Sequence, residues 1–490
     1  MAIATRKRQK NRDGLNPMPH RIFEIDEILR AIVWHTRVIS ETTTVSLACC
    51  CKAFEEPALS PLWVQKSFHE LPALLTHSTE PTARPTEEEW ERFQRYSSWI
   101  WFLSVDLTAG YSTEVLTLLN LIVPSFAGGQ QATTRVFPNL RNLTWDGEPS
   151  SLLHLPSFVS SVLTDLRVRV TILWETEHFP GEYAPLESAI NSTIYPPNLQ
   201  SLCLYIPPEA NPSPELKRDV ANLILQCGSA LTTLEVEFEL PEPVVMHLMS
   251  LPNLKIWRLA QPAPMKLLSS PLRPTIPFAQ VVYLAVRTAN PHTWLSFLSA
   301  LVGEKSHPSP VPRASAFAFK NLTHLDIDPP SGQGCPYSCT FLLTDSDISL
   351  LADVLPRLEW VWLGVPCFFN TCQTTFRSLY TLSTRCPRLQ HICIHINTTT
   401  LVQDIRSFFE EERTETQGAR PGPNIGRRSC PLDFRYVQYL PLEENVGVGD
   451  LEVVVKGFFD ISVTINNVTV SDSNSKLWAK VSKGIKALHV

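Results

Sequence analysis

The sequence contains no apolar run that approaches the roughly 18 residues needed for a membrane-spanning helix. It is also poor in charge, since Asp, Glu, Lys and Arg make up 18% of the chain, against about 25% in typical soluble proteins. The 42 basic and 48 acidic residues give a net charge of -6, with no long block of either sign in the body of the chain. We therefore expect neither a membrane nor a nucleic acid as a partner, and the 44% of apolar residues predicts a large buried core.

A secretory signal is missing as well, because the first residues, MAIATRKRQKNR, are basic and contain no apolar segment. We expect a disordered tail over 1–17 and a cytoplasmic or nuclear protein. The basic run is either a nuclear localisation patch or a plain charged tail. The twelve cysteines are scattered, which favours free thiols over disulfides. The pairs Cys335/Cys339 and Cys367/Cys372 lack the CxxC spacing of zinc sites, so we expect no metal.

Catalytic motifs are absent too. The sequence has no HExxH, no GxSxG, no P-loop and no GxGxxG. We expect no catalytic residues, no cofactor and no enzymatic activity of the chain itself.

The most informative feature is a short phrase, LxxLxL, whose three apolar positions recur ten times. The phrases begin at residues 100, 140, 163, 199, 231, 254, 281, 322, 358 and 389. Five of them are preceded by Pro-Asn or Pro-Arg, which predicts a turn before a short strand. Between them lie segments of helical periodicity, such as 215–227, 292–302 and 345–355.

One such unit cannot bury its apolar face alone, so the units must stack. We predict an α/β fold in which an irregular leucine-rich-repeat-like solenoid carries parallel strands on its concave face and helices on its convex face. The predicted divisions are a tail at 1–17, a helical module at 18–68, a connector at 69–95, the solenoid at 96–470 and a capping helix at 471–490. Exposed loops are expected near 303–318, 329–344 and 410–430. A conventional doubly wound α/β domain is the alternative.

Residues between the apolar positions of each phrase are expected to point outward on the concave face. They give a candidate target-binding surface of Arg258, Tyr283, His324, Asp326, Trp360, Trp362 and His391, together with Lys255, Glu359 and Gln390. The two tryptophans are the sharpest candidates, because tryptophan is enriched at the energetic centres of protein interfaces. The alternative is that a loop from a neighbouring long unit covers them.

The first residues after the tail predict two apolar helices. In residues 25–33, IDEILRAIV, apolar side chains recur on one face, and Asp26 is placed to cap the helix. Residues 42–54 predict a second helix in which Leu47, Cys50, Cys51 and Phe54 share a face. A module this small cannot supply a sufficient core of its own, so another surface must complete it.

Residues 46–63, SLACCCKAFEEPALSPLW, resemble the F-box of fungal proteins of the basidiomycete type that carry a C-terminal leucine-rich-repeat region. The likeness extends over about 19–68 and departs at Asp26, where the family has proline. It implies a substrate-recognition subunit of a Skp-cullin-F-box ubiquitin ligase, with a Skp-type adaptor of a cullin–RING ligase and an unknown target protein as partners. By position, the adaptor-facing and interhelix residues would be Ile25, Ile28, Leu29, Ile32, Leu47, Cys51, Leu59, Leu62 and Trp63.

Three alternatives remain open at this point. In the first, Trp63 anchors the module to the first repeat instead of contacting an adaptor. In the second, the helices belong to a plain interaction scaffold that recruits no ligase, and the departure from the family pattern at Asp26 favours this interpretation. Finally, an enzyme with an unrecognised site on the solenoid would show a deep pocket with converging titratable groups.

Overall fold

The computed structural model describes residues 25–71, 74, 86–107, 136–171, 198–206, 214–260, 278–288, 291–302, 319–328, 343–363, 373–394, 401–407, 410, 432–433 and 463–464. Within these ranges, thirteen strands form one sheet in chain order, and every neighbouring pair is parallel. The strands are β1 (Gln65–Ser67), β2 (Phe102–Asp106), β3 (Asn142–Gly147), β4 (Asp165–Val170), β5 (Ser201–Tyr205), β6 (Thr233–Val236), β7 (Ile256–Ala260), β8 (Tyr283–Arg287), β9 (His324–Asp328), β10 (Trp360–Leu363), β11 (His391–Cys393), β12 (Leu432–Asp433) and β13 (Val463–Thr464).

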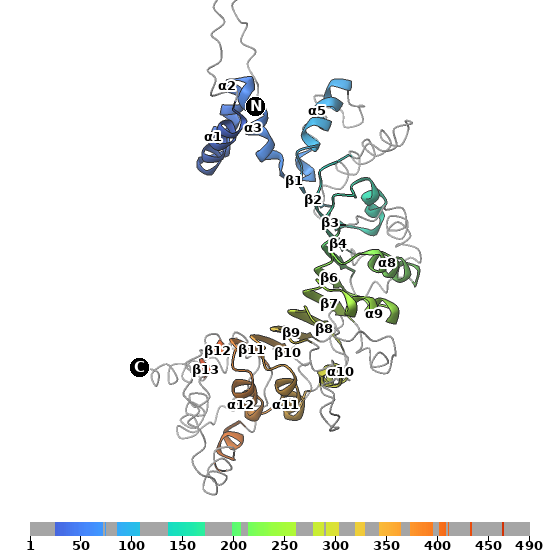
Figure 1. Cartoon of the computed structure of the whole chain (residues 1–490), viewed down its shortest axis with the longest axis vertical. Coiled ribbons are helices and arrows are strands. Elements are labelled where there is room, and N and C mark those ends of the chain that lie inside the picture. The colour runs from blue at the N-terminus through green and yellow to red at the C-terminus, as the bar shows by residue number, and fades with distance from the viewer. Residues whose placement is uncertain are drawn as a thin grey trace, which may run out of the picture.

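Helices connect many of the strands along the outer side of the sheet. They are α5 (Glu87–Ser97), η3 (Pro149–Ser157), α8 (Pro214–Gln226), α9 (Glu242–Ser250), α10 (Pro291–Val302), α11 (Asp345–Val354) and α12 (Phe376–Arg385), with the short η2 (Phe68–Glu70) after β1. The sheet curves into an arc with its strands on the inside and α8 to α12 on the outside (Figure 1). The predicted leucine-rich-repeat-like solenoid is confirmed, including its concave strands and convex helices.

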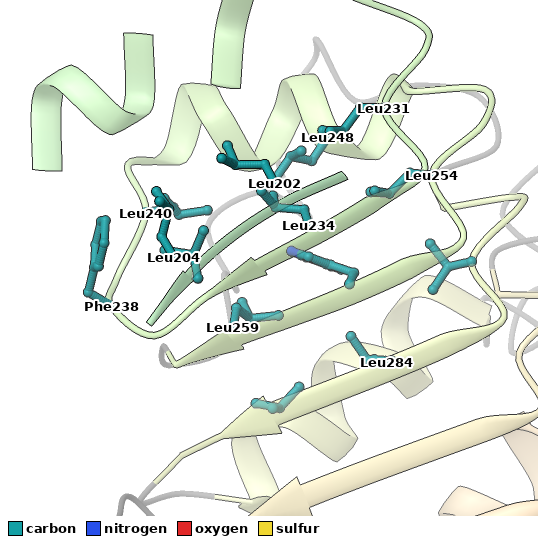
Figure 2. Close-up of a cluster of buried hydrophobic side chains, with 14 of the residues drawn as sticks. Leu202, Leu204, Leu231, Leu234, Phe238, Leu240, Leu248, Leu254, Leu259 and Leu284 are labelled. Carbon is teal, nitrogen blue, oxygen red and sulfur yellow. The ribbon is translucent and has the colours of Figure 1, made fainter. Parts of the chain in front are cut away.

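All ten LxxLxL phrases form strands, each beginning two residues after the first apolar position. The second and third apolar positions point into the core. In β6, for example, Leu234 and Val236 are fully buried while Thr233 and Glu235 are only half-buried. The buried leucines of neighbouring repeats lie between the strands and the outer helices (Figure 2). One continuous hydrophobic core runs from Phe68 to Ile405.

Side chains just before the strands join one repeat to the previous one. The asparagines Asn139, Asn253 and Asn321 each donate a side-chain hydrogen bond to a backbone carbonyl of the previous repeat, at 2.7 to 2.9 Å. Arg357 makes the same kind of contact at 3.2 Å. Asn139, Asn253 and Arg357 each follow a proline, so at these three positions the Pro-Asn or Pro-Arg signal also marks a residue that satisfies a backbone carbonyl of the previous repeat.

Three helices precede the sheet, namely α1 (Asp26–Ile39), α2 (Glu41–Cys50) and α3 (Lys52–Trp63). They share a small core of Leu29, Val33, Ala48, Phe54 and Ala58 that is separate from the solenoid core. Strand β1 begins two residues after α3 ends, so the sheet starts within the range predicted for the helical module.

Two local expectations about these helices are wrong. Asp26 is the first helical residue, where its carboxylate binds Arg30, and Ile25 occupies the N-cap position without a side-chain cap. The predicted helix at 42–54 is broken at Cys51, whose backbone is extended (φ -157°, ψ 159°). The break lets α3 fold back so that Phe54 joins the core, and it leaves Cys50 and Cys51 exposed rather than on a shared buried face.

Several expectations fall on residues outside the described ranges. These are the tail at 1–17, most of the loops near 303–318, 329–344 and 410–430, the capping helix at 471–490 and the pairs Cys335/Cys339 and Cys367/Cys372. In the described ranges, no helix is long and apolar enough to span a membrane. No cluster of three or more His, Cys, Asp or Glu with metal-binding geometry occurs among those same residues.

Candidate protein-binding surfaces

The strand alternation places three rows of side chains on the concave face. The in-register pairing aligns Tyr283, His324, Trp360 and His391 in one row. A second row contains Glu235, Arg258, Ala285, Asp326 and Trp362. A third lies near the strand ends and includes Tyr205, Arg287 and Asp328. Because successive strands are about 4.8 Å apart, neighbours in a row are within side-chain reach of each other.

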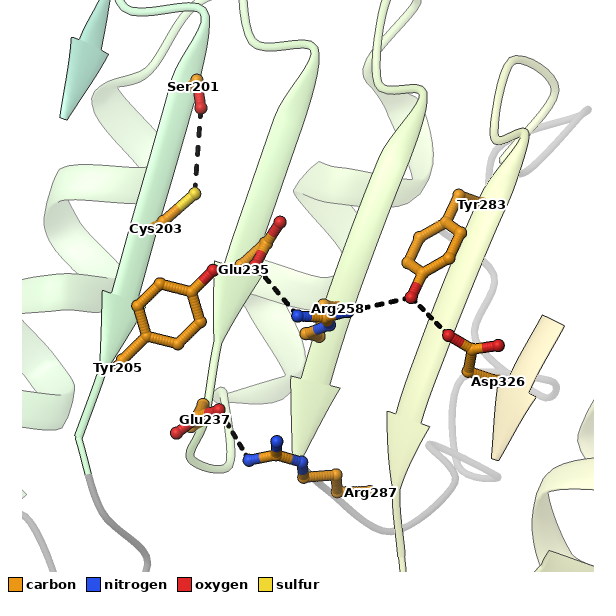
Figure 3. Close-up of polar contacts among 9 residues, drawn as sticks. All are labelled: Ser201, Cys203, Tyr205, Glu235, Glu237, Arg258, Tyr283, Arg287 and Asp326. Carbon is orange, nitrogen blue, oxygen red and sulfur yellow. Dashed lines mark hydrogen bonds and ion pairs between the residues drawn. The ribbon is translucent and has the colours of Figure 1, made fainter. Parts of the chain in front are cut away.

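A chain of hydrogen bonds crosses the face from β5 to β9 (Figure 3). Tyr205 donates its hydroxyl hydrogen to Glu235, which also accepts a hydrogen bond from Arg258 at 3.3 Å. The other terminal nitrogen of Arg258 donates to the Tyr283 hydroxyl oxygen at 2.9 Å, and Tyr283 donates in turn to Asp326. Every link joins residues of adjacent strands, so the chain fixes these five side chains relative to one another.

The electrostatic surroundings of this hydrogen-bond network keep Tyr205 and Tyr283 protonated, so that both act as hydrogen-bond donors. Burial, followed by the hydrogen bond to Asp326, raises the pKa of Tyr283 to about 12. Burial and the hydrogen bond to Glu235 likewise raise the pKa of Tyr205. Arg258 has a raised pKa despite its partial burial, because Tyr283 and Glu235 surround it with acceptors. The arginine is therefore committed to internal partners.

A row of rings continues the face from β8 to β11, and we call Tyr283, His324, Trp360 and His391 the aromatic ladder. The ring centroids of Tyr283 and His324 are 6.2 Å apart, and those of His324 and Trp360 are 6.3 Å apart. Trp360 and His391 are closest, at 4.4 Å. All four side chains are half-buried, so each ring is held by its neighbours while one part stays exposed on the concave face.

Two carboxylates lie beside the ladder on β9, and we call Asp326 and Asp328 the acidic pair. Burial raises the pKa of Asp326, against the hydrogen bond from Tyr283 and the charge of Arg258. Burial also raises the pKa of Asp328, whose Oδ1 atom accepts a hydrogen bond from Trp362 Nε1 at 2.7 Å. Both carboxylates are thus oriented by neutral donors, and no described basic side chain forms an ion pair with either.

The structure brings the seven predicted target-binding residues together on one continuous stretch of the concave face, from β7 to β11. The three further residues, Lys255, Glu359 and Gln390, instead lie one residue before their strands. There, their backbone N–H groups bond to carbonyls of the previous repeat at 2.8 Å. The outward alternation starts one position later, at Ile256, Trp360 and His391.

Sequence reasoning missed five polar members of the face, namely Glu235, which lies within its own phrase, and four residues that follow their phrases. Tyr205, Glu237, Arg287 and Asp328 lie one position beyond the LxxLxL phrase, where the alternation continues outward. Arg287 and Glu237 form an ion pair at 2.6 Å across two repeats. Extending each phrase by one residue would have identified this third row.

The residues proposed to face an adaptor fall into three groups in the helical module. Leu29 belongs to its core, whereas Ile28, Ile32, Leu47, Leu59, Leu62 and Trp63 are half-buried, and Ile25 and Cys51 are exposed. The half-buried members Ile32, Leu47 and Leu59 pack on the edge of the core. They therefore combine an interhelix contact with a solvent-facing edge.

Helix α1 also carries large apolar side chains that its own core does not use. Trp34 is 64% exposed, Val38 is 75% exposed and Ile39 is 79% exposed. Trp34 and Val38 are four residues apart and so share one face of the helix. Val45 of α2 is exposed as well. Exposed apolar groups this close together on a small module are typical of an interaction surface.

The helical module is attached to the solenoid through α3 and α5. The rings of Trp63 and Tyr96 lie 4.7 Å apart, and Arg95 pairs with Glu55 at 3.0 Å. Trp63 also packs against the solenoid core. This is the anchoring contact that the sequence left open as an alternative for Trp63.

Comparison with known proteins adds little to these observations. No protein-family model matches the chain, and no curated protein matches it. Among solved structures, the chain is similar to a crystal structure of a complex of Rad7 and Elc1 from yeast, with 14% sequence identity and a TM-score of 0.28. The match covers 70% of this chain and 90% of that one.

Proposed function

We propose that this chain is the substrate-recognition subunit of a Skp-cullin-F-box type ubiquitin ligase. In this proposal, the helices α1 to α3 bind a Skp-type adaptor, and the concave face of the solenoid binds the protein to be modified. The chain supplies no chemistry of its own, since ubiquitin transfer belongs to other subunits of such a ligase.

The observation that carries the adaptor half of the proposal is the division of apolar side chains in the helical module. Five buried residues form its core, and a larger set on α1 and α2 stays partly or fully exposed. A core of this size stabilises a module weakly, and covering the exposed apolar side chains with a partner would remove further apolar area from water. The resemblance of residues 46–63 to an F-box indicates that this partner is a Skp-type adaptor.

The target half rests on the open concave face. Its polar and aromatic side chains come from many successive repeats and are fixed by hydrogen bonds between strands. A broad face of oriented polar groups and rings suits a protein partner, because tryptophan, tyrosine and arginine are enriched where interfaces are strongest.

The direct test is affinity capture of the full chain from cells in which the proteasome and cullin activation are blocked. The proposal expects the adaptor and a cullin among the captured proteins, together with at least one protein that is lost when the concave face is altered. Capture of interactors without an adaptor or cullin would overturn the ligase assignment and support the rival interpretation, a scaffold that recruits no ligase.

A further inference from the structure

The concave face between β6 and β9 carries more negative than positive charge. Two arginines, Arg258 and Arg287, face four carboxylates, Glu235, Glu237, Asp326 and Asp328, which gives a formal net charge of -2. Arg258 is paired with Glu235 and Arg287 with Glu237. The excess negative charge therefore lies at the acidic pair on β9.

The surroundings of the acidic pair stabilise its geometry without neutralising it. Tyr283 and Trp362 each donate one hydrogen bond to a carboxylate of the pair. The Oδ1 atom of Asp326 is buried without a hydrogen bond of normal geometry from a described residue, and a looser contact with Trp360 favours the charged form of this carboxylate. The charges of Arg258 and Arg287 offset the burial of these carboxylates only in part, because the pKa of each is still raised. A cation brought to this position therefore gains more than it would in open solvent.

Aromatic rings stand directly beside these carboxylates. Strand pairing places Trp360 next to His324 and Trp362 next to Asp326. The faces of tryptophan rings attract cations, and the attraction grows when the cation is partly removed from water. The rings and the carboxylates on adjacent strands thus offer two favourable contacts to one positively charged side chain. The carboxylates would repel an anion, and the faces of the rings would not attract one.

We infer that Asp326, Asp328, Trp360 and Trp362 form a subsite for a lysine or arginine side chain of the target protein. The inference rests on the proposed function in one respect, namely that the concave face binds a protein. It adds the chemistry of recognition: a basic residue of the target lies over the tryptophan rings with its charge toward the acidic pair. The arginines of the face take no part in holding it, since both are paired internally.

The test uses the purified full chain and a phage-displayed library of random twelve-residue peptides. We expect the enriched peptides to share Lys or Arg at one aligned position. In synthetic copies of them, replacing that residue by norleucine or citrulline should weaken binding about tenfold or more. Enrichment of peptides without a shared basic position, or no enrichment at all, would overturn the subsite.

The variant that removes only the charge is the double substitution Asp326→Asn and Asp328→Asn. Each asparagine keeps a carbonyl acceptor for Tyr283 or Trp362, so the face retains its hydrogen bonds. We expect about tenfold weaker peptide binding, whereas Asp353→Asn removes one charge from the convex helix α11 and should have no effect. Binding within twofold of the original chain for the double variant contradicts the subsite.

A second pair of variants tests the rings. Trp360→Phe keeps a weaker aromatic face and Trp360→Ala removes it, so affinity should fall in that order. Equal affinities for the two variants would show that the ring does not meet the cation. Adaptor binding is measured on the same preparations: its absence would count against the ligase assignment alone, while failure of peptide selection would count against the subsite alone.

Discussion

The indole nitrogen of Trp362 donates a hydrogen bond to Asp328 across the boundary between β9 and β10, at 2.7 Å. Trp360, two residues earlier, is instead held by ring contacts with His324 and His391. The two outward tryptophans of one strand are thus held differently: Trp362 by a well-formed hydrogen bond to Asp328, and Trp360 by its ring contacts together with a looser contact to Asp326. Both keep an exposed part on the concave face.

Trp360→Ala should cost much less stability than Trp257→Ala. Trp257 is fully buried and stacks on Phe278 with ring centroids 4.5 Å apart, so its removal should cost about 3–5 kcal/mol. Trp360 is half-buried, and we expect its loss to cost about 1–2 kcal/mol. Hydrogen–deuterium exchange of β7 and β10 measures both effects locally, which suits a repeat protein that need not unfold in one step. Equal destabilisation would mean that Trp360 is a core residue and not part of a binding surface.

Asp345→Ala should loosen the contact between α11 and α12. The carboxylate of Asp345 accepts hydrogen bonds from the backbone N–H of Thr375 at 2.7 Å and from the Thr375 hydroxyl at 2.6 Å, and Ser378 also donates to it. The substitution leaves these donors without an acceptor, which should cost about 2–3 kcal/mol. Protection of the α12 amides from exchange is the measurement.

The control on the same helix is Asp353→Ala. Asp353 is 61% exposed and pairs only with Arg385 on the surface, so its loss should change stability by less than about 0.5 kcal/mol. If the two variants behave alike, Asp345 does not join the helices in the way its contacts indicate.

Asp326→Asn should make the stability of the chain less dependent on pH. Burial raises the pKa of Asp326 above its ordinary value of 3.8. A carboxyl with a raised folded-state pKa favours folding most when protonated, so this contribution is complete below pH 3.8 and is lost as the pH rises through the folded-state pKa. The stability of the original chain relative to the variant should therefore fall over that interval. Denaturant unfolding at a series of pH values measures the difference, and a rise with pH would show that the carboxylate is stabilised by the fold.

The solenoid could be predicted because one rule places each strand. In every phrase, the apolar positions alternate with outward ones, and burial of residues such as Leu234 and Val236 leaves a single acceptable orientation. Strand β1 escaped prediction because its residues, Gln65 to Ser67, include no apolar side chain. Its position follows from α3 before it and from the Val64 carbonyl, which accepts hydrogen bonds from Trp101 and Phe102.

The rows of the concave face were predictable, but the contacts within them were not. Alternation places Arg258 and Tyr283 outward, yet nothing in their own phrases shows that Glu235 and Asp326 receive their hydrogen bonds. Those pairings depend on how phrases separated by 23 to 41 residues align across the sheet. The break at Cys51 was hidden for a similar reason, since the need to bring Phe54 onto Leu29 and Val33 is a property of the folded module.

The central claim is that α1 to α3 bind a Skp-type adaptor, and calorimetric titration of the purified full chain with purified adaptor tests it most directly. Ile28→Asp places a charge on the half-buried edge of α1 and should abolish binding. Ile25→Asp removes an exposed apolar side chain while supplying the N-cap carboxylate that α1 lacks, so it should weaken binding without destabilising the helix. Leu225→Asp is the control, because Leu225 is 42% exposed on α8 and Ile25 is 43% exposed. The account predicts a one-to-one complex that both α1 variants impair and the control preserves. No heat of binding with the original chain, or equal binding by Ile28→Asp and Leu225→Asp, would contradict it.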